Sequence, residues 1–174
     1  QKSLVYIGTH AGGLTVLHRN SGKMESFNQL NSQLVNENVY AILPDKGGNL
    51  LLGTLSALVS FNPEKKSFTT IDKEKDGTPF TSQRITILFR DSHKRLWVGG
   101  EEGISVFQQE GIEIEKTPIL PESSVTKIFT NCIYEAANGI IWIGTREGFY
   151  CFNEKEKKIK RYTTANGLPN NVVY

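Results

Sequence analysis

"IIWIGTREGFYCF", residues 140–152, places a tryptophan in a β-branched run, stops at Gly144-Thr145 and resumes two residues later at a second glycine. Three other stretches repeat this phrase: "LVYIGTHAGGLTVL" at 4–17, "LLLGTLSALVSF" at 50–61 and "LWVGGEEGISVF" at 96–107. The glycines that end the first apolar run, Gly8, Gly53, Gly99 and Gly144, are separated by 45, 46 and 45 residues. A period of about 45 residues is typical of the blades of β-propellers. The phrase therefore predicts a repeated structural unit.

Each period reads as four short β-strands. The first is rich in β-branched and aromatic residues and ends at a turn containing Asp, Asn or Gly. The phrase above supplies the second and third strands, and a more polar fourth strand suits the outer edge of a sheet. The predicted first strands are 38–45, 84–91 and 130–137. Helical periodicity is not sustained anywhere, so we expect almost no helix.

The fold class predicted from this pattern is an all-β β-propeller with four consecutive four-stranded antiparallel blades. The approximate blade units are 1–37, 38–83, 84–129 and 130–169, with 170–174 beginning the next strand. The chain enters at a second strand, so two arrangements are open. Either the tail completes the first sheet and closes a four-bladed ring, or the repeats form a section of a larger propeller. We favour the section, and expect its exposed blade faces to contact neighbouring blades or a second copy.

Two residue types in the phrase carry specific expectations. The recurring glycine predicts either a positive φ or a close approach of another backbone, and the Thr or Gly after it predicts a small side chain. Trp97 and Trp142 are interpreted as core residues between blades, each with a partner for its indole N–H, rather than as platforms that stack on sugars.

Composition excludes several classes of function. The formal net charge of +2 is too small for a nucleic-acid binder. The charge run at 154–162 is interpreted as a solvated outer hairpin, and the two cysteines are too few for a disulfide framework. No apolar run has the length of a membrane span, and no metal-binding, nucleophile or phosphate-cradling motif occurs. We therefore expect no catalytic residue, no metal, no cofactor and no enzyme activity in this segment.

The ending "NGLPNNVVY" at 166–174, a strand closed by Asp and a Gly-containing turn, and "W-[IV]-G-T" followed by a second glycine together resemble a known repeat. It is the two-component-regulator propeller repeat, as in the periplasmic sensor region of bacterial hybrid two-component histidine kinases. The resemblance implies a periplasmic sensor whose parent is anchored in the inner membrane through other parts of the chain. It also implies recognition of oligosaccharides released from glycans. Repeat two departs from the pattern by lacking the tryptophan and second glycine, Gly100 replaces the usual threonine, and Ala136 replaces the turn aspartate.

Geometry indicates where a ligand would bind. In an antiparallel blade, the turn from strand two to three and the crossover from strand four to the next blade lie at the same end, and their residues vary between the repeats. The polar residues in these loops are His10, Glu101, Arg146 and Glu147 in the first set, and Asn36, Gln83, Arg84, Asn170 and Asn171 in the second. We select His10, Arg84, Glu101, Arg146 and Asn171 as candidate ligand-binding residues, because such groups suit hydroxyl-rich ligands. The alternative is that they only cap turns in water.

Three functions compete. The favoured one is ligand sensing by an extracytoplasmic propeller, with the signal passed across the membrane to a kinase. The second is a non-catalytic scaffold for interaction or dimerisation. The third, a propeller lyase or hydrolase, would need convergent histidine or carboxylate ligands, and the adjacent pair Glu101-Glu102 is better explained as an exposed turn.

Overall fold

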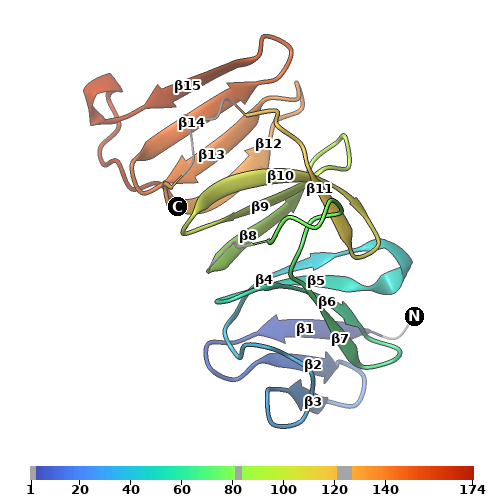
Figure 1. Ribbon diagram of the computed structural model, residues 1–174. Helices are drawn as coiled ribbons and strands as arrows, with labels where there is room; N and C mark the ends of the chain where they lie inside the picture. Colours follow the sequence, from blue (N-terminus) through green and yellow to red (C-terminus); the bar gives the residue numbers. More distant parts are fainter. Residues whose placement is uncertain (1–2, 81–83, 121–126) are drawn as a thin grey trace.

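The repeat unit folds into a twisted antiparallel sheet, and four such sheets stand side by side in chain order (Figure 1). The computed structural model describes residues 3–80, 84–120 and 127–174. Blade 1 contains β1 (Leu4–Gly8), β2 (Leu14–His18) and β3 (Lys23–Phe27). Blade 2 contains β4 (Val39–Pro44), β5 (Leu50–Thr54), β6 (Leu58–Asn62) and β7 (Ser67–Ile71). Blade 3 contains β8 (Ile85–Arg90), β9 (Leu96–Gly100), β10 (Gly103–Glu110) and β11 (Glu113–Lys116). Blade 4 contains β12 (Thr130–Glu135), β13 (Ile141–Thr145), β14 (Gly148–Asn153) and β15 (Lys158–Tyr162).

This arrangement confirms the predicted all-β propeller. Each blade is a meander in which consecutive strands pair, and blade 1 has three described strands because the chain enters at the second-strand position. The helical elements in the described part of the chain are two short 3₁₀ turns, η1 (Lys46–Gly48) and η2 (Thr164–Asn166). Blades 1 and 4 lie at opposite ends of the array in Figure 1, so the described blades form an open arc and no closed ring.

The hydrophobic core consists of three layers, one between each pair of neighbouring blades. The first contains Leu14, Phe27, Leu52 and Phe61 from blades 1 and 2. The second joins Leu51 and Leu58 to Leu96 and Phe107, and the third joins Trp97 and Val106 to Ile143 and Phe152. Alternate residues of one strand therefore face different neighbours, because successive side chains of a strand point to opposite faces of the sheet. A blade in isolation would leave one or both of these faces in water.

The repeated glycines are contact points between blades. None of the four has a positive φ, and the predicted close approach of another backbone is found at Gly8 and Gly53, whereas side-chain atoms are nearest at Gly99 and Gly144. A β-carbon at Gly8 would lie 2.5 Å from the carbonyl oxygen of Val39, and one at Gly53 would lie 2.7 Å from that of Ile85. Both neighbours open the first strand of the following blade. The threonine after the glycine has a small side chain, as predicted, and it also forms a hydrogen bond. The Thr54 hydroxyl donates to the Ala57 carbonyl at 2.8 Å and closes the turn to β6.

The C-terminal tail occupies the position of a further first strand. The Val173 amide donates to the Thr145 carbonyl at 2.8 Å, as the Val39 amide donates to Thr9 at 3.0 Å. The Asn131 side chain fixes the same segment by donating to the Val173 carbonyl at 2.8 Å. The tail therefore packs on blade 4 and does not complete the sheet of blade 1, so the ring-closure alternative is not formed.

The two tryptophans have different environments. Trp97 is 0% exposed between blades 3 and 4, and its indole N–H donates to Asp91 at 2.8 Å, which confirms the prediction for this residue. Trp142 departs from it: this side chain is half-buried on the outward face of blade 4 and stacks on Phe149 with ring centroids 5.0 Å apart. The reason is that no described blade covers that face. Ala136 also replaces the aspartate that would accept the Trp142 N–H.

A buried ionic cluster joins blades 3 and 4 at the end that carries the turns between first and second strands. Asp91 accepts hydrogen bonds from the Arg95 amide at 2.8 Å and from Arg95 Nε at 2.7 Å. The two terminal nitrogens of Arg95 donate to both carboxylate oxygens of Glu154 at 2.6 Å. The interpretation of 154–162 as a solvated hairpin is thus wrong for its first residue. These hydrogen bonds hold the pKa of Glu154 below its ordinary value and raise the pKa of Arg95.

Candidate functional site

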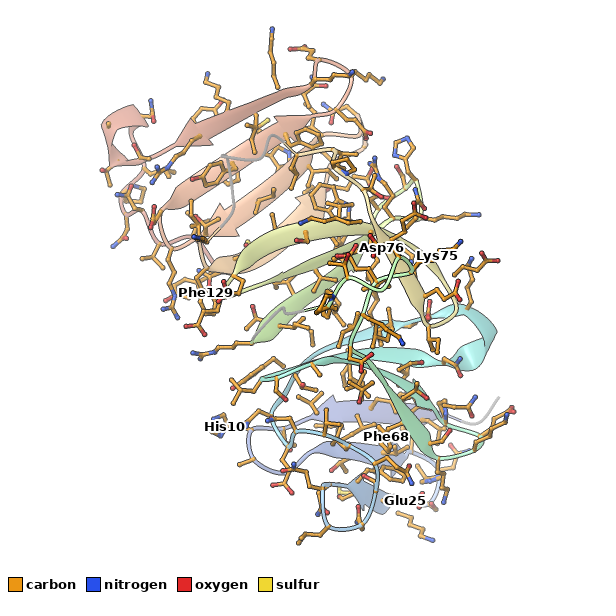
Figure 2. All side chains as sticks on the ribbon, viewed as in Figure 1. His10, Glu25, Phe68, Lys75, Asp76 and Phe129 are labelled. Carbon is orange, nitrogen blue, oxygen red and sulfur yellow. The ribbon has the colours of Figure 1, made fainter. Side chains whose placement is uncertain are left out.

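The loops that connect second to third strands, and each blade to the next, gather at one end of the array. Figure 2 shows His10 and Phe129 at this same edge, although they come from blade 1 and from the crossover into blade 4. We call this edge the loop end. The ionic cluster lies at the other end, so the two features do not share residues.

Four side chains at the loop end form an alternating series of rings and guanidinium groups. The Arg84 guanidinium carbon lies 5.7 Å from the ring centre of Tyr40 and 5.5 Å from that of Phe129. The Arg146 guanidinium carbon lies 4.0 Å from the Phe129 ring centre. We call Tyr40, Arg84, Phe129 and Arg146 the arginine–aromatic row. His10 extends it, because its ring centroid lies 6.5 Å from that of Tyr40.

The backbone explains why these residues meet. The pairing of β4 with β5 shifts register between Val39 and Ala41, which leaves Tyr40 at a β-bulge, a device that redirects a side chain. Arg84 has φ 46°, a left-handed conformation uncommon outside glycine, and its amide donates to the Leu55 carbonyl of blade 2 at 2.7 Å. A non-glycine residue held in this conformation is a reason to look for function nearby.

The second half of the row is fixed by the register of blade 4. Thr130 pairs with Thr145, so the residues just outside the ladder, Phe129 and Arg146, also lie opposite each other. The Arg146 amide donates to the Phe129 carbonyl at 3.1 Å. Arg146 therefore belongs to a short, hydrogen-bonded pair of residues rather than to a free loop. Its exposed side chain covers the half-buried Phe129 ring.

The charges of the row have no ionic partner in the part of the chain that the structure describes. Within residues 3–80, 84–120 and 127–174, no ion pair includes Arg84 or Arg146. The acidic residue nearest to Arg146 in sequence, Glu147, lies 3.5 Å from Arg161 instead. Arg84 Nε is buried and has no hydrogen-bond partner among the described residues. Since buried cationic groups are usually paired, the Arg84 guanidinium has binding capacity that no described residue uses, and the exposed Arg146 guanidinium lies beside the same ring.

The predicted residues have different fates. His10, Arg84 and Arg146 are brought together through the two aromatic rings. Glu101 is exposed in the turn after β9, and it lies opposite Arg84 because Ile85 pairs with Gly100. Asn171 accepts a hydrogen bond from the Thr164 amide at 2.8 Å, which is a turn-capping role.

The asparagines of the crossovers behave similarly. Asn36 and Asn170 each accept from the amide two residues later, at 2.9 and 2.8 Å. Gln83 lies outside the described residues. For the asparagines, the capping alternative therefore has direct support.

Tyr40 and Phe129 are the residues that sequence reasoning missed. They were assigned to strands or their edges, where an aromatic residue is normally core. A signal was present: both stand beside the residue that begins a first strand, at the same loop end as the selected arginines. Only the packing of adjacent blades shows that their rings lie against guanidinium groups.

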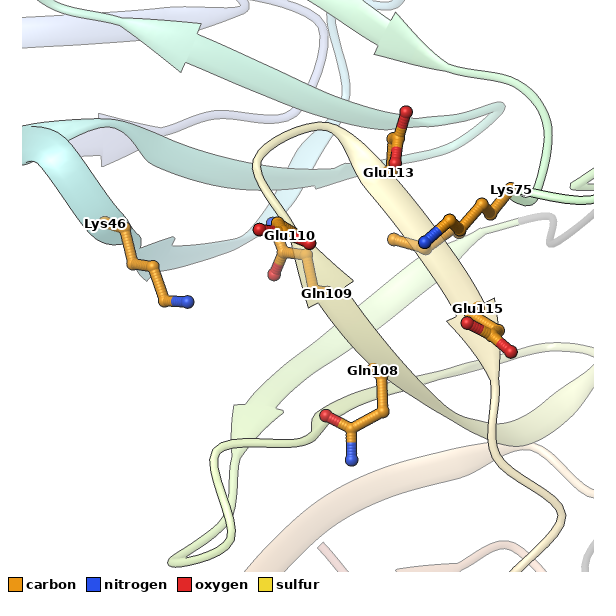
Figure 3. A pocket seen from close by; sticks show the side chains of 8 residues that line it. Lys46, Lys75, Gln108, Gln109, Glu110, Glu113 and Glu115 are labelled. Atoms are coloured by element: carbon orange, nitrogen blue, oxygen red, sulfur yellow. The ribbon is translucent and has the colours of Figure 1, made fainter.

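One hollow elsewhere on the surface is less suited to recognition. Figure 3 shows it beside the β10–β11 hairpin, with a cavity volume of about 280 Å³. Its lining consists of Lys46, Lys75, Gln108, Gln109, Glu110, Glu113, Ile114 and Glu115. These side chains surround an outer edge strand, where long charged residues normally protect an open edge. Nothing in this lining supplies an aromatic face.

Two further findings concern the described part of the chain. No group of three or more His, Cys, Asp or Glu side chains within it is arranged to hold a metal ion. No helix in the same part is long and apolar enough to cross a membrane.

Comparison with known proteins gives a consistent repeat type. Residues 120–147 match the family model described as two component regulator propeller. Among curated proteins, histidine kinase P4 of Formosa agariphila is 29% identical over 93 residues, which are 52% of this chain and 7% of the kinase. The chain thus matches less than a tenth of that relative's length.

Solved structures show the same fold. The extracellular domain of the putative one component system BT4673 from B. thetaiotaomicron aligns with a TM-score of 0.79 at 20% identity, covering 99% of this chain and 23% of that domain. The extracellular domain of the putative hybrid two component system BT3049 from B. thetaiotaomicron aligns with a TM-score of 0.69 at 21% identity, covering 91% and 22%. The chain spans less than a quarter of either domain.

Proposed function

We propose that this chain, which carries the two component regulator propeller repeat, is a ligand-sensing segment of an extracytoplasmic sensor in a hybrid two-component histidine kinase. The observation that carries this proposal is the pairing of this repeat type with the arginine–aromatic row at the loop end. Loops on a rigid β scaffold are a usual place for binding residues. The extracytoplasmic location and the link to a kinase are part of the proposal, since they rest on longer relatives.

The ligand that we propose is an oligosaccharide derived from a glycan. Arginine edges supply hydrogen-bond donors for sugar oxygens, and Glu101 supplies acceptors for sugar hydroxyl groups. Exposed parts of Tyr40 and Phe129 would contact the apolar face of a sugar ring. A chain of sugars also matches a row that extends across several blades.

Such a ligand would restrain the blades relative to one another. His10 belongs to blade 1 and Arg146 to blade 4, so a ligand that contacts both favours one relative position of the blades. A ligand shifts a conformational equilibrium only by its difference in affinity between two states. The proposed signal is therefore a change in blade arrangement that would be passed to the rest of the sensor.

Isothermal titration of this chain with a panel of plant, algal and host oligosaccharides tests the proposal. Binding by at least one oligosaccharide, weakened by Arg146→Ala, is the expected result. The control is Arg19→Ala, which removes one exposed positive charge in the β2–β3 turn at the other end of the sheet. Absence of binding across the panel, with folded protein confirmed by circular dichroism, would refute oligosaccharide sensing by this segment.

The second candidate, a non-catalytic interaction scaffold, is favoured by the uncovered faces at the two ends of the array. Met24 is 63% exposed on blade 1, and Tyr134 is 64% exposed beside Trp142 on blade 4. Exposed apolar groups on a blade are typical of surfaces that contact another protein. Sedimentation velocity across micromolar concentrations measures this: concentration-dependent association supports the scaffold, whereas a constant monomer contradicts it.

A further inference from the structure

The two arginines of the row lie against aromatic rings, and among residues 3–80, 84–120 and 127–174 no carboxylate forms an ion pair with either of them. Arg84 lies between the Tyr40 and Phe129 rings, at 5.7 and 5.5 Å from their centres, and Arg146 lies 4.0 Å from the Phe129 centre. Stacking on an aromatic face restricts a guanidinium group before any ligand arrives. Less conformational entropy is then lost when its N–H groups form hydrogen bonds. The row is therefore preorganised for a ligand group that accepts from a fork of donors.

The electrostatics select the charge of that group. Both guanidinium carbons lie within 5.5 Å of one ring centre, and neither arginine forms an ion pair among the described residues. Glu101 lies opposite Arg84 by register but is not paired with it. The contacts of the two guanidinium groups that the structure describes are with aromatic rings, and two cationic groups around one ring favour an approaching anion.

We propose that the arginine–aromatic row binds a carboxylate group, so that the oligosaccharide sensed by this chain is an acidic one containing uronic acid residues. This inference rests on the proposed function and names the substrate class of the same site. A carboxylate fits a guanidinium through two parallel N–H to oxygen bonds, an arrangement that a neutral hydroxyl does not provide. A sulfate ester shares the negative charge and can also accept from two N–H groups of the fork, so a sulfated oligosaccharide is included in the test.

Matched oligosaccharides separate these possibilities. The chain is titrated with tetragalacturonate, with alginate tetrasaccharides and with glucuronate-containing tetrasaccharides, each beside its carboxyl-reduced counterpart of equal length. A sulfated galactan tetrasaccharide and unsubstituted neutral tetrasaccharides complete the set. Measurements at two salt concentrations report the ionic share of the affinity, since screening weakens exposed charge interactions.

At least one uronate oligosaccharide is expected to bind, and reduction of its carboxyl groups should lower the affinity by roughly ten- to a hundred-fold, the range for hydrogen bonds to charged groups. Arg146→Ala should cause a similar loss, and Arg146→Lys should recover only part of it because lysine lacks the fork. Arg84→Ala should act like Arg146→Ala, and Arg19→Ala should bind as the unchanged chain does. Arg146 is exposed, so its variants keep the test decisive even where Arg84→Ala folds poorly.

Equal binding of acidic and carboxyl-reduced forms would overturn the inference and leave oligosaccharide sensing intact. Binding of only the sulfated or only the neutral set would also overturn it. Absence of any binding would remove the inference and the proposed oligosaccharide ligand together.

Discussion

Replacing Asp91 by alanine should destabilise the protein more than any other substitution in its turns. The carboxylate of Asp91 accepts three hydrogen bonds, two from Arg95 and one from the indole of Trp97, at 2.7 to 2.8 Å. The Asp91 side chain is 0% exposed and that of Arg95 is 7% exposed. Removing one partner of a buried ion pair costs about 3–5 kcal/mol. Arg95 would keep Glu154, so we expect the lower part of this range, about 3 kcal/mol.

Thermal unfolding followed by circular dichroism measures the effect. For a chain of this length, 1 kcal/mol shifts the midpoint by roughly 2–4 °C, so Asp91→Ala should lower it by about 6–12 °C. Trp97 fluorescence provides a second probe, because its N–H loses its acceptor in the variant. Oligosaccharide binding at temperatures where the variant is folded should be retained, since Asp91 lies at the end away from the row.

The matched control is Asp45→Ala at the equivalent turn of blade 2. Asp45 accepts from Arg90 at 3.0 Å and from Gln109 at 2.9 Å, and these partners also bond to each other at 2.6 Å. Because the Arg90 side chain is 22% exposed and keeps the Gln109 contact, we expect a loss of about 1–2 kcal/mol. An Asp91→Ala loss below about 1 kcal/mol, or no larger than that of Asp45→Ala, would refute the reasoning.

Three other perturbations test the contacts between blades. Gly53→Ala should lower the free energy of unfolding, measured with urea, by about 1–3 kcal/mol, because the new β-carbon would lie 2.7 Å from the backbone of the next blade. Gly99→Ala should lower this free energy by less, because the nearest neighbour of its β-carbon is a side-chain atom at 3.2 Å that can move. Equal losses of stability in the two variants would contradict this account. Hydrogen bonds from Arg95 lower the pKa of Glu154 in the folded protein. The unchanged protein should therefore be more stable than Glu154→Gln at pH values above 4.5, the ordinary pKa of glutamate, and this difference should disappear as pH falls through the lower folded pKa. A difference that persists in acid would exclude this linkage. In the Trp142→Phe variant the remaining tryptophan is Trp97, which is 0% exposed, so acrylamide should hardly quench its fluorescence. Strong quenching would show that the core layer between blades 3 and 4 is open to solvent.

Much of the fold could be predicted because the repeat is local. Each strand and turn of a blade is specified by alternation, by β-branched residues and by turn residues within about 45 positions of one another. The predicted first strands at 38–45, 84–91 and 130–137 correspond to β4, β8 and β12 within about two residues. Because the pattern occurs four times, the fold could be predicted even though the second copy lacks the tryptophan.

The site was predictable only as a region. The antiparallel meander indicated which loops share an end, and His10, Arg84 and Arg146 do lie there together. It did not indicate that two aromatic residues would link them. Three of the polar loop residues, all asparagines, turned out to cap turns, a role that depends on backbone geometry within each loop.

By itself, then, the sequence determined the period, the blade and the strand order, since these follow from short-range backbone chemistry. It also marked the recurring glycines, but the contacts that require Gly8 and Gly53 come from the neighbouring blade. Tertiary structure alone decided that Arg95 reaches Glu154, 59 residues away, and that Arg84 lies between the Tyr40 ring of β4 and the Phe129 ring of the connection to blade 4. The physical reason is that a repeat fixes equivalent positions within blades, whereas contacts across blades depend on the twist, bulges and spacing of neighbouring sheets. Side chains that meet across such an interface have no common signal along the chain.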